Sequence, residues 1–160
     1  MNTQRLMTSF FGIGFVSFAP GTLASFTTSI LILLFSNQNQ RLGFLICLFF
    51  LLIFSLVTLF FSKKTIDLTQ KKDPSEIVSD EVAGQALAIL ALPLDGTFIV
   101  NTGQVLFAFA IFRILDISKP PPISTSEKIS GPVGILIDDL IAGLITGFIL
   151  IAISPLLGWS

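Results

Sequence analysis

The sequence has 160 residues, of which 52% are hydrophobic and only 12% are charged, whereas a soluble domain carries about 25% charged residues. This composition excludes an ordinary soluble domain and predicts one integral membrane domain over residues 1–160. The net charge of −1 offers no electrostatic footprint for nucleic acid. The absence of histidine excludes a Ser-His-Asp triad and histidine-rich zinc sites.

The N-terminal half predicts a short apolar segment followed by two long helices. Residues 10–19 are apolar but too short to cross a bilayer as a helix, so we expect a re-entrant or interfacial segment. Thr22 is a suitable N-cap for a first helix over residues 22–36. After a polar turn, residues 42–62 contain no charged side chain and match the roughly 20 residues that a membrane-spanning helix needs.

The C-terminal half follows a hydrophilic connection and predicts three further helices. The first, over residues 77–94, should stop at Pro93, and residues 95–104 should form a loop. The others are expected over residues 105–118 and 131–154. Gly143 and Gly147 on the last helix should let a neighbouring helix approach closely. The sequence thus predicts an all-α polytopic membrane bundle of about four to five membrane helices, preceded by the short N-terminal segment.

The distribution of Lys and Arg predicts the orientation of this bundle in the membrane. If the connection after residue 62 is cytoplasmic, the outer turns contain Arg41 as their basic residue. The inner segments then contain Arg5, Lys63, Lys64, Lys71, Lys72, Lys119 and Lys128. With this orientation, four polar clusters lie at or near the cytoplasmic ends of their helices: Pro20-Gly21-Thr22, Asp80-Glu81, Arg113-Asp116-Lys119 and Asp138-Asp139.

Acidic residues within these apolar segments are the main candidates for function. Asp138 and Asp139 lie in the last helix, where an ionisable residue costs roughly 2.5–3.5 kcal/mol on insertion scales. Asp80 and Glu81 lie near the start of an earlier helix, where they would also complement the helix dipole. Asp80 and Asp139 are each followed four residues later by a glycine. This spacing would place each carboxylate one turn from a point of close approach.

Basic residues accompany the acids on the remaining helix. Arg113 and Asp116 are three residues apart and share a helix face, so they would either form an intrahelical ion pair or act in a site, or do both. Arg113 is suited to a bidentate grip on phosphate, and Lys119 adds a second positive charge. Several carboxylates without histidine form an oxygen-ligand set suited to Mg²⁺. The residues thus indicate a membrane enzyme that handles a phosphate at the cytoplasmic interface.

Two other classes of protein are compatible with the same residues. In a small transporter or channel subunit, the intramembrane acids would serve as cation or proton sites. Such a protein needs polar residues near the middle of the membrane, whereas here they gather toward one face. In a structural or assembly protein, the acids would pair with basic residues of a partner.

Four motifs occur in a fixed order along almost the whole chain. They are Gly12-x-Gly14 with Ala19-Pro20-Gly21-Thr22, Asp80-Glu81-x-x-Gly84, Phe112-Arg113-Ile114-Leu115-Asp116-x-x-Lys119-Pro120-x-Pro122, and Gly131-x-x-Gly134-Ile135-x-x-Asp138-Asp139-x-x-Ala142-Gly143. This order and spacing resemble the phosphatidylglycerophosphatase A family. The resemblance implies an all-helical, Mg²⁺-dependent enzyme of the bacterial inner membrane. It would hydrolyse the terminal phosphomonoester of its lipid substrate, phosphatidylglycerophosphate, among the membrane lipids.

The resemblance also suggests a role for each candidate residue. We expect the catalytic residues to be Asp80, Arg113, Asp116 and Asp139, with Asp116 acting as a further metal ligand or as the base for the attacking water. The expected Mg²⁺ ligands are Asp80, Glu81, Asp138 and Asp139. The expected substrate-binding residues are Gly21, Thr22, Arg113 and Lys119, with the first two contacting phosphate at a helix N-terminus.

Overall fold

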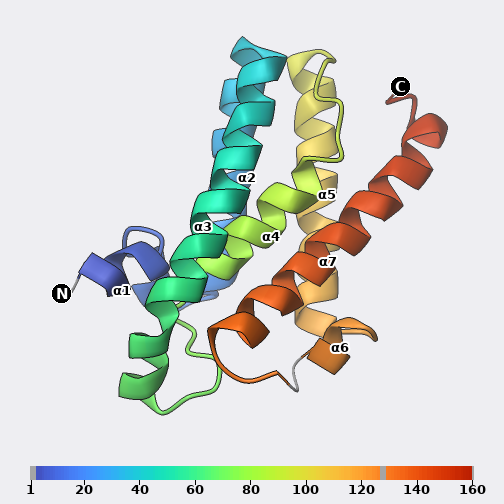
Figure 1. Ribbon diagram of the computed structural model, residues 1–160. Coiled ribbons are helices and arrows are strands. Elements are labelled where there is room, and N and C mark those ends of the chain that lie inside the picture. Colours follow the sequence, from blue (N-terminus) through green and yellow to red (C-terminus); the bar gives the residue numbers. More distant parts are fainter. Residues whose placement is uncertain (1–2, 127–128, 160) are drawn as a thin grey trace.

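The computed structural model describes residues 3–126 and 129–159 (Figure 1). All regular elements within these residues are α-helices or 3₁₀ turns. No strand occurs within these residues, so the predicted all-α class is confirmed. The elements are α1 (Thr3–Thr8), the 3₁₀ turn η1 (Ile13–Phe15), α2 (Pro20–Gln38), α3 (Gln40–Thr69), α4 (Ser79–Ile89), α5 (Phe98–Ser118), α6 (Ile123–Ser126), α7 (Pro132–Ile153) and the 3₁₀ turn η2 (Ser154–Leu157).

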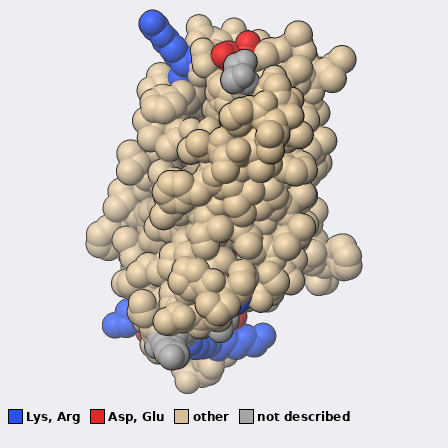
Figure 2. Space-filling model, turned by 90° about the vertical axis from the view of Figure 1, so that its right-hand side faces the viewer, with Lys and Arg blue, Asp and Glu red and all other residues tan. Residues whose placement is uncertain are grey.

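Four of the described helices, α2, α3, α5 and α7, are long and apolar enough to cross a membrane, and η2 extends α7. Figure 2 shows the Lys, Arg, Asp and Glu side chains of one face gathered at the two ends of the molecule, with an uncharged band between them. The predicted membrane bundle is therefore confirmed. Helix α4 differs, because its 11 residues extend only about 16 Å, roughly half of a bilayer core.

Helices α4 and α7 run side by side across the middle of the bundle, and they form its most extensive contact among the described elements (Figure 1). Two glycines make this contact possible. A Cβ added to Gly143 would overlap the backbone carbonyl of Gly84, and one added to Gly84 would lie 2.6 Å from the carbonyl oxygen of Asp139. The repeated spacing of acid and glycine thus marks the crossing of α4 and α7, one turn from Asp80 and Asp139.

The N-terminal segment lies against the connection between α3 and α4. The backbone N–H of Val78 donates to the carbonyl of Thr8 over 2.9 Å, and Arg5 forms an ion pair with Glu76. Gly14 packs against the carbonyl of Glu76, where a side chain would not fit. On the segment between α1 and α2, the side chains of Phe11 and Phe18 are exposed. The re-entrant or interfacial placement of residues 10–19 stays a prediction.

Several predicted helix ends were wrong. Helix α2 begins at Pro20, so Thr22 is not its N-cap; Ala19 takes that position in the left-handed region and gives no side-chain cap bond. Proline suits the first helical position because it lacks the N–H that would be unpaired there. Helix α3 continues past the predicted end at residue 62 to Thr69, because its last two turns extend beyond the apolar band and need no apolar side chains.

The predicted loop over residues 95–104 was wrong as well, because α5 begins at Phe98. Thr97 caps it by accepting a hydrogen bond from the N–H of Val100. Asn101 and Gln104, within the predicted loop, are buried in the helix, and Asn101 accepts a hydrogen bond from the N–H of Gly96. In contrast, α4 stops at Ile89, before Pro93. Residues 90–97 then return as irregular chain to the start of α5.

The described basic residues follow the predicted distribution. The starts of α2 and α7 and the ends of α3 and α5 lie at one end of the bundle, which also carries α1 (Figure 1). All described Lys and Arg residues lie in these parts or in the connection that follows α3, except Arg41, at the start of α3 on the opposite end. Lys128 lies outside the described residues.

Candidate active site

A cavity of about 410 Å³ opens at the basic end of the bundle, where α2, α4 and α7 begin and α5 ends. Its wall contains residues from all four predicted motifs, which lie up to 120 positions apart in the chain, from Ala19 to Asp139. The lining includes all nine predicted site residues: Gly21, Thr22, Asp80, Glu81, Arg113, Asp116, Lys119, Asp138 and Asp139. The fold thus brings the predicted residues into one place, while their individual roles stay predictions.

Three acids form a tight cluster about one turn from the crossing of α4 and α7. Asp80, Glu81 and Asp139 each offer a carboxylate oxygen, and these three oxygens lie within 4.8 Å of one another. Asp80 and Asp139 are only 5% and 4% exposed. In each of the three residues one carboxylate oxygen is buried without a hydrogen-bond partner among the described residues. Because such oxygens are costly to bury alone, the cluster fits a hard divalent cation.

The electrostatics of the cluster support the same conclusion. Burial raises the pKa of Asp80 well above its usual range, and the neighbouring carboxylate of Glu81 adds to the shift. Burial likewise raises the pKa of Glu81, with Asp139 as the next cause, while Arg113 opposes the shift. Mutual repulsion and burial therefore both disfavour the ionised cluster unless positive charge is added.

Arg113 is the basic residue nearest to this cluster. Its Nη1 donates to Asp116 Oδ2 over 2.6 Å, which is the intrahelical pair anticipated from the sequence. The same nitrogen lies 4.0 Å from Glu81 Oε1. The Nε–H group is buried and has no hydrogen-bond partner among the described residues. Asp116 therefore orients Arg113 toward the acids and leaves a buried donor for a further oxygen.

Lys119 and Asp138 form a second polar group in the same cavity. Lys119 Nζ lies 3.3 Å from Asp138 Oδ2, at the point where α5 ends in a left-handed residue. Asp138 is outside the group of three close acids because adjacent helical residues point about 100° apart. The structure thus places Asp138 with Lys119, and its role as a metal ligand stays a prediction.

The first turn of α2 forms the opposite wall. A Cβ added to Gly21 would overlap the Glu81 carboxylate, reaching 2.7 Å from its Cδ, and would lie 3.4 Å from Arg113 Nη1. Glycine therefore allows the Glu81 carboxylate to lie against this turn, and a larger residue would force that side chain to shift. Thr22 follows in the same turn, where unpaired helical N–H groups favour an anion.

Two polar residues of the cavity wall, Asp73 and Ser75, were not predicted from the sequence; they lie on the segment between α3 and α4. This segment was interpreted only as a hydrophilic connection. Asp73 lies close enough to raise the pKa of both Asp80 and Glu81. The signal available in the sequence was its position a few residues before the acids of α4.

The rim of the cavity includes an apolar side chain that faces away from the protein. Ile117, in the last turn of α5, lines the cavity and is 70% exposed. Ile114, one turn earlier on the same helix, is 64% exposed. A polar cavity with such a rim opens next to the surface that contacts lipid.

Comparisons with known proteins agree with this site. A sequence model of the family described as Phosphatidylglycerophosphatase A matches residues 6–154. The chain is 34% identical over 156 residues to "Phosphatidylglycerophosphatase A" of Haemophilus influenzae, covering 96% of this chain and 90% of that protein. It is 42% identical over 79 residues to the Escherichia coli protein of the same name, covering 49% of this chain and 43% of that protein.

A further relative carries a different name. A protein of Bacteroides thetaiotaomicron named "Putative phosphatidylinositol-3-phosphatase" is 35% identical over 157 residues, covering 90% of this chain and 88% of its own. No solved structure matches the chain.

Proposed function

Because this chain belongs to the phosphatidylglycerophosphatase A family, we propose that it hydrolyses the terminal phosphomonoester of phosphatidylglycerophosphate in a Mg²⁺-dependent reaction. The products are phosphatidylglycerol and inorganic phosphate. The observation that supports this most directly is the cluster of Asp80, Glu81 and Asp139, whose buried oxygens lack partners among the described residues. It lies beside Arg113 in a cavity next to the lipid-facing surface.

The charge of the cavity supports the need for a cation. Six carboxyl groups line it, against only Arg113 and Lys119 as basic side chains. A phosphate dianion would be repelled by this excess of negative charge. We propose Asp80, Glu81 and Asp139 as the Mg²⁺ ligands, with Asp138 nearby as a further one. Bound Mg²⁺ would polarise a phosphoryl oxygen and lower the pKa of a water molecule.

The side chains of the cavity have complementary proposed roles. Arg113 grips the phosphate through donors that its pair with Asp116 leaves available, and Lys119 adds positive charge from the other side. Gly21 and Thr22 offer backbone N–H groups at the start of α2. Asp116 either accepts the proton of the attacking water or adds a ligand, and it holds Arg113 in both cases.

The location is proposed from the distribution of basic residues. The cavity opens at the end of the bundle that carries all described Lys and Arg residues but Arg41. By the positive-inside rule this end faces the cytoplasm. We therefore place the enzyme in the bacterial inner membrane with its site in the cytoplasmic leaflet. A transporter or channel is not supported, because the acids converge at one end of the bundle.

Phosphate release provides the direct test. The purified full chain in detergent micelles, given phosphatidylglycerophosphate and Mg²⁺, should release inorganic phosphate. Chelation should abolish the activity and added Mg²⁺ should restore it, because the acid cluster then loses or regains its cation. Phosphatidylinositol 3-phosphate serves as the second substrate, in view of the Bacteroides relative's name. Undiminished turnover in chelator would refute the metal dependence, and faster turnover of the inositol lipid would refute the proposed substrate.

The contact between Gly21 and Glu81 gives a sharper prediction. In Gly21→Ala the new Cβ overlaps the Glu81 carboxylate, so that side chain must shift from its place in the cluster. We expect turnover to fall about 100-fold, the size of effect that a displacement of about 1 Å can have. Steady-state phosphate release measures this, with the thermal unfolding midpoint as the check on folding. Unchanged turnover in a folded variant would show that Glu81 is not needed in its present position.

A further inference from the structure

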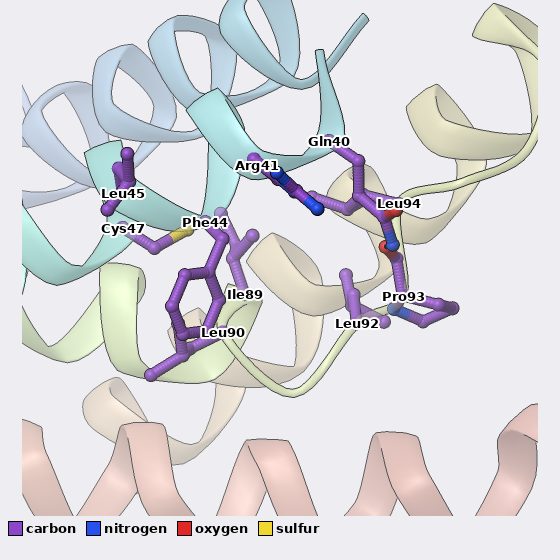
Figure 3. A pocket seen from close by; sticks show the side chains of 10 residues that line it. All are labelled: Gln40, Arg41, Phe44, Leu45, Cys47, Ile89, Leu90, Leu92, Pro93 and Leu94. Carbon is purple, nitrogen blue, oxygen red and sulfur yellow. The ribbon is translucent and has the colours of Figure 1, made fainter.

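A second cavity, of about 470 Å³, lies at the opposite end of the bundle from the acids. It exists because α4 ends at Ile89 and residues 90–97 continue as irregular chain, which leaves the space beside the start of α3 unfilled. Figure 3 shows Phe44, Cys47, Ile89 and Leu90 toward one side of the cavity, and Gln40 and Arg41 near the Leu92–Leu94 segment. The volume falls in the range of about 300–1,000 Å³ usual for ligand sites.

The cavity is apolar along its depth and basic at its edge. Phe44 and Leu45 are 52% and 58% exposed, so this wall is open to the lipid side. The other end is fixed, because Gln40 Nε2 donates to the carbonyl of Pro93 over 2.8 Å and ties α3 to the irregular segment. An extended apolar chain could lie along Phe44 and Cys47 with its polar end beside Gln40.

Arg41 determines which polar headgroup a chain bound in this cavity can carry. It is the sole Lys or Arg of the described residues at this end of the bundle, and its side chain is exposed. The structure shows no ion pair between its guanidinium and any described residue. A guanidinium beside an apolar groove at membrane depth complements a lipid phosphate with a net negative headgroup.

From these contacts we propose that the cavity formed by Gln40, Arg41, Phe44, Cys47 and Leu90 binds an anionic phospholipid of the leaflet opposite the acid cavity. One acyl chain lies in the groove and the phosphodiester lies against Arg41. This site is separate from the phosphatase cavity and does not depend on the proposed reaction. The bound lipid would fill the space that remains beside α3 because α4 ends at Ile89.

A local fluorescence measurement tests the proposal. Trp159 is the single tryptophan, so Leu45→Trp in a Trp159→Phe background reports only on the cavity. The protein is placed in phosphatidylcholine vesicles that contain a minor fraction of chain-brominated phosphatidylglycerol or chain-brominated phosphatidylcholine. We expect about fivefold preferential quenching by the anionic lipid, the effect of one basic residue near such headgroups. Adding Arg41→Gln should remove this preference.

Two controls make the test specific. Leu156→Trp in the same background places the probe at the same end of the bundle, outside the cavity, on a residue that is 85% exposed. It should be quenched equally by both lipids. Lys64→Gln, which removes a charge at the opposite end, should leave the cavity preference intact. Equal quenching at the cavity, a preference that survives Arg41→Gln, or the same preference at the control position would overturn the proposal.

Native mass spectrometry gives a second measurement without an added tryptophan. The wild-type chain should retain phosphatidylglycerol more strongly than phosphatidylcholine of the same acyl composition. In Arg41→Gln the preference for phosphatidylglycerol over phosphatidylcholine should fall by the same factor of about five. Retention that does not change in Arg41→Gln would count against the site.

Discussion

Replacing Asp139 by asparagine is expected to lower phosphate release by at least about 100-fold while the bundle remains folded. Asparagine has nearly the same shape but offers no anionic oxygen to the cluster with Asp80 and Glu81. Because the site is buried and three carboxylates repel one another there, removing one charge should leave stability unchanged or higher in the absence of metal.

Thermal unfolding and turnover together separate these effects. Mg²⁺ should raise the unfolding midpoint of the wild-type chain, because an ion that binds only the folded state stabilises it, and it should do so less in Asp139→Asn. The matched control is Asp67→Asn, which removes an exposed acid on the last turns of α3. Wild-type turnover in Asp139→Asn would remove this residue from the reaction.

Replacing Gly143 by alanine is expected to destabilise the bundle and reduce activity together. The added Cβ overlaps the carbonyl of Gly84, so α4 and α7 must separate at their crossing. Overpacking of this kind typically costs about 1–3 kcal/mol. The acids lie one turn from the crossing, so the carboxylate cluster should open as well. The unfolding midpoint in detergent and the rate of phosphate release are the measurements.

Gly103→Ala is the matched control for this prediction. Gly103 lies within α5, and a Cβ there meets nothing within 4 Å. Alanine at an open helical position should be neutral or should stabilise by about 0.5–1 kcal/mol. If Gly143→Ala behaved like Gly103→Ala, the close approach of the two backbones would not be what positions the acids.

The polar residues of the site could be predicted because apolar helices make charged residues conspicuous. Asp138 and Asp139 stand out within α7, and the spacing of Arg113 and Asp116 predicts the pair that the structure shows. The spacing from acid to glycine predicted that Gly84 and Gly143 are points of close approach. It did not predict that these two glycines contact each other. That contact depends on tertiary packing, which local spacing does not determine.

The wrong predictions for α4, for the start of α5 and for the cavity wall also arise from tertiary packing, which local sequence does not determine. Residues 95–104 were predicted as a loop, but α5 begins at Phe98 and the bundle buries Asn101 and Gln104 within it. The length of α4 was overestimated because residues 90–94 are as apolar as a helix would require. Asp73 and Ser75 precede the acids of α4 by only a few residues, but their place in the cavity wall depends on tertiary contacts of their segment, such as the Arg5–Glu76 pair and the packing of Gly14.

The exposed Ile117 at the rim of the acid cavity indicates a lateral route for a lipid substrate. Lipid can enter along this apolar edge by lateral diffusion, without leaving the leaflet. The dephosphorylated lipid, which has lost its terminal charge, can return the same way. The relevant concentration is then the mole fraction of substrate in the membrane surface. Diluting the lipid with inert detergent should therefore slow the enzyme even when the bulk concentration of substrate is held constant.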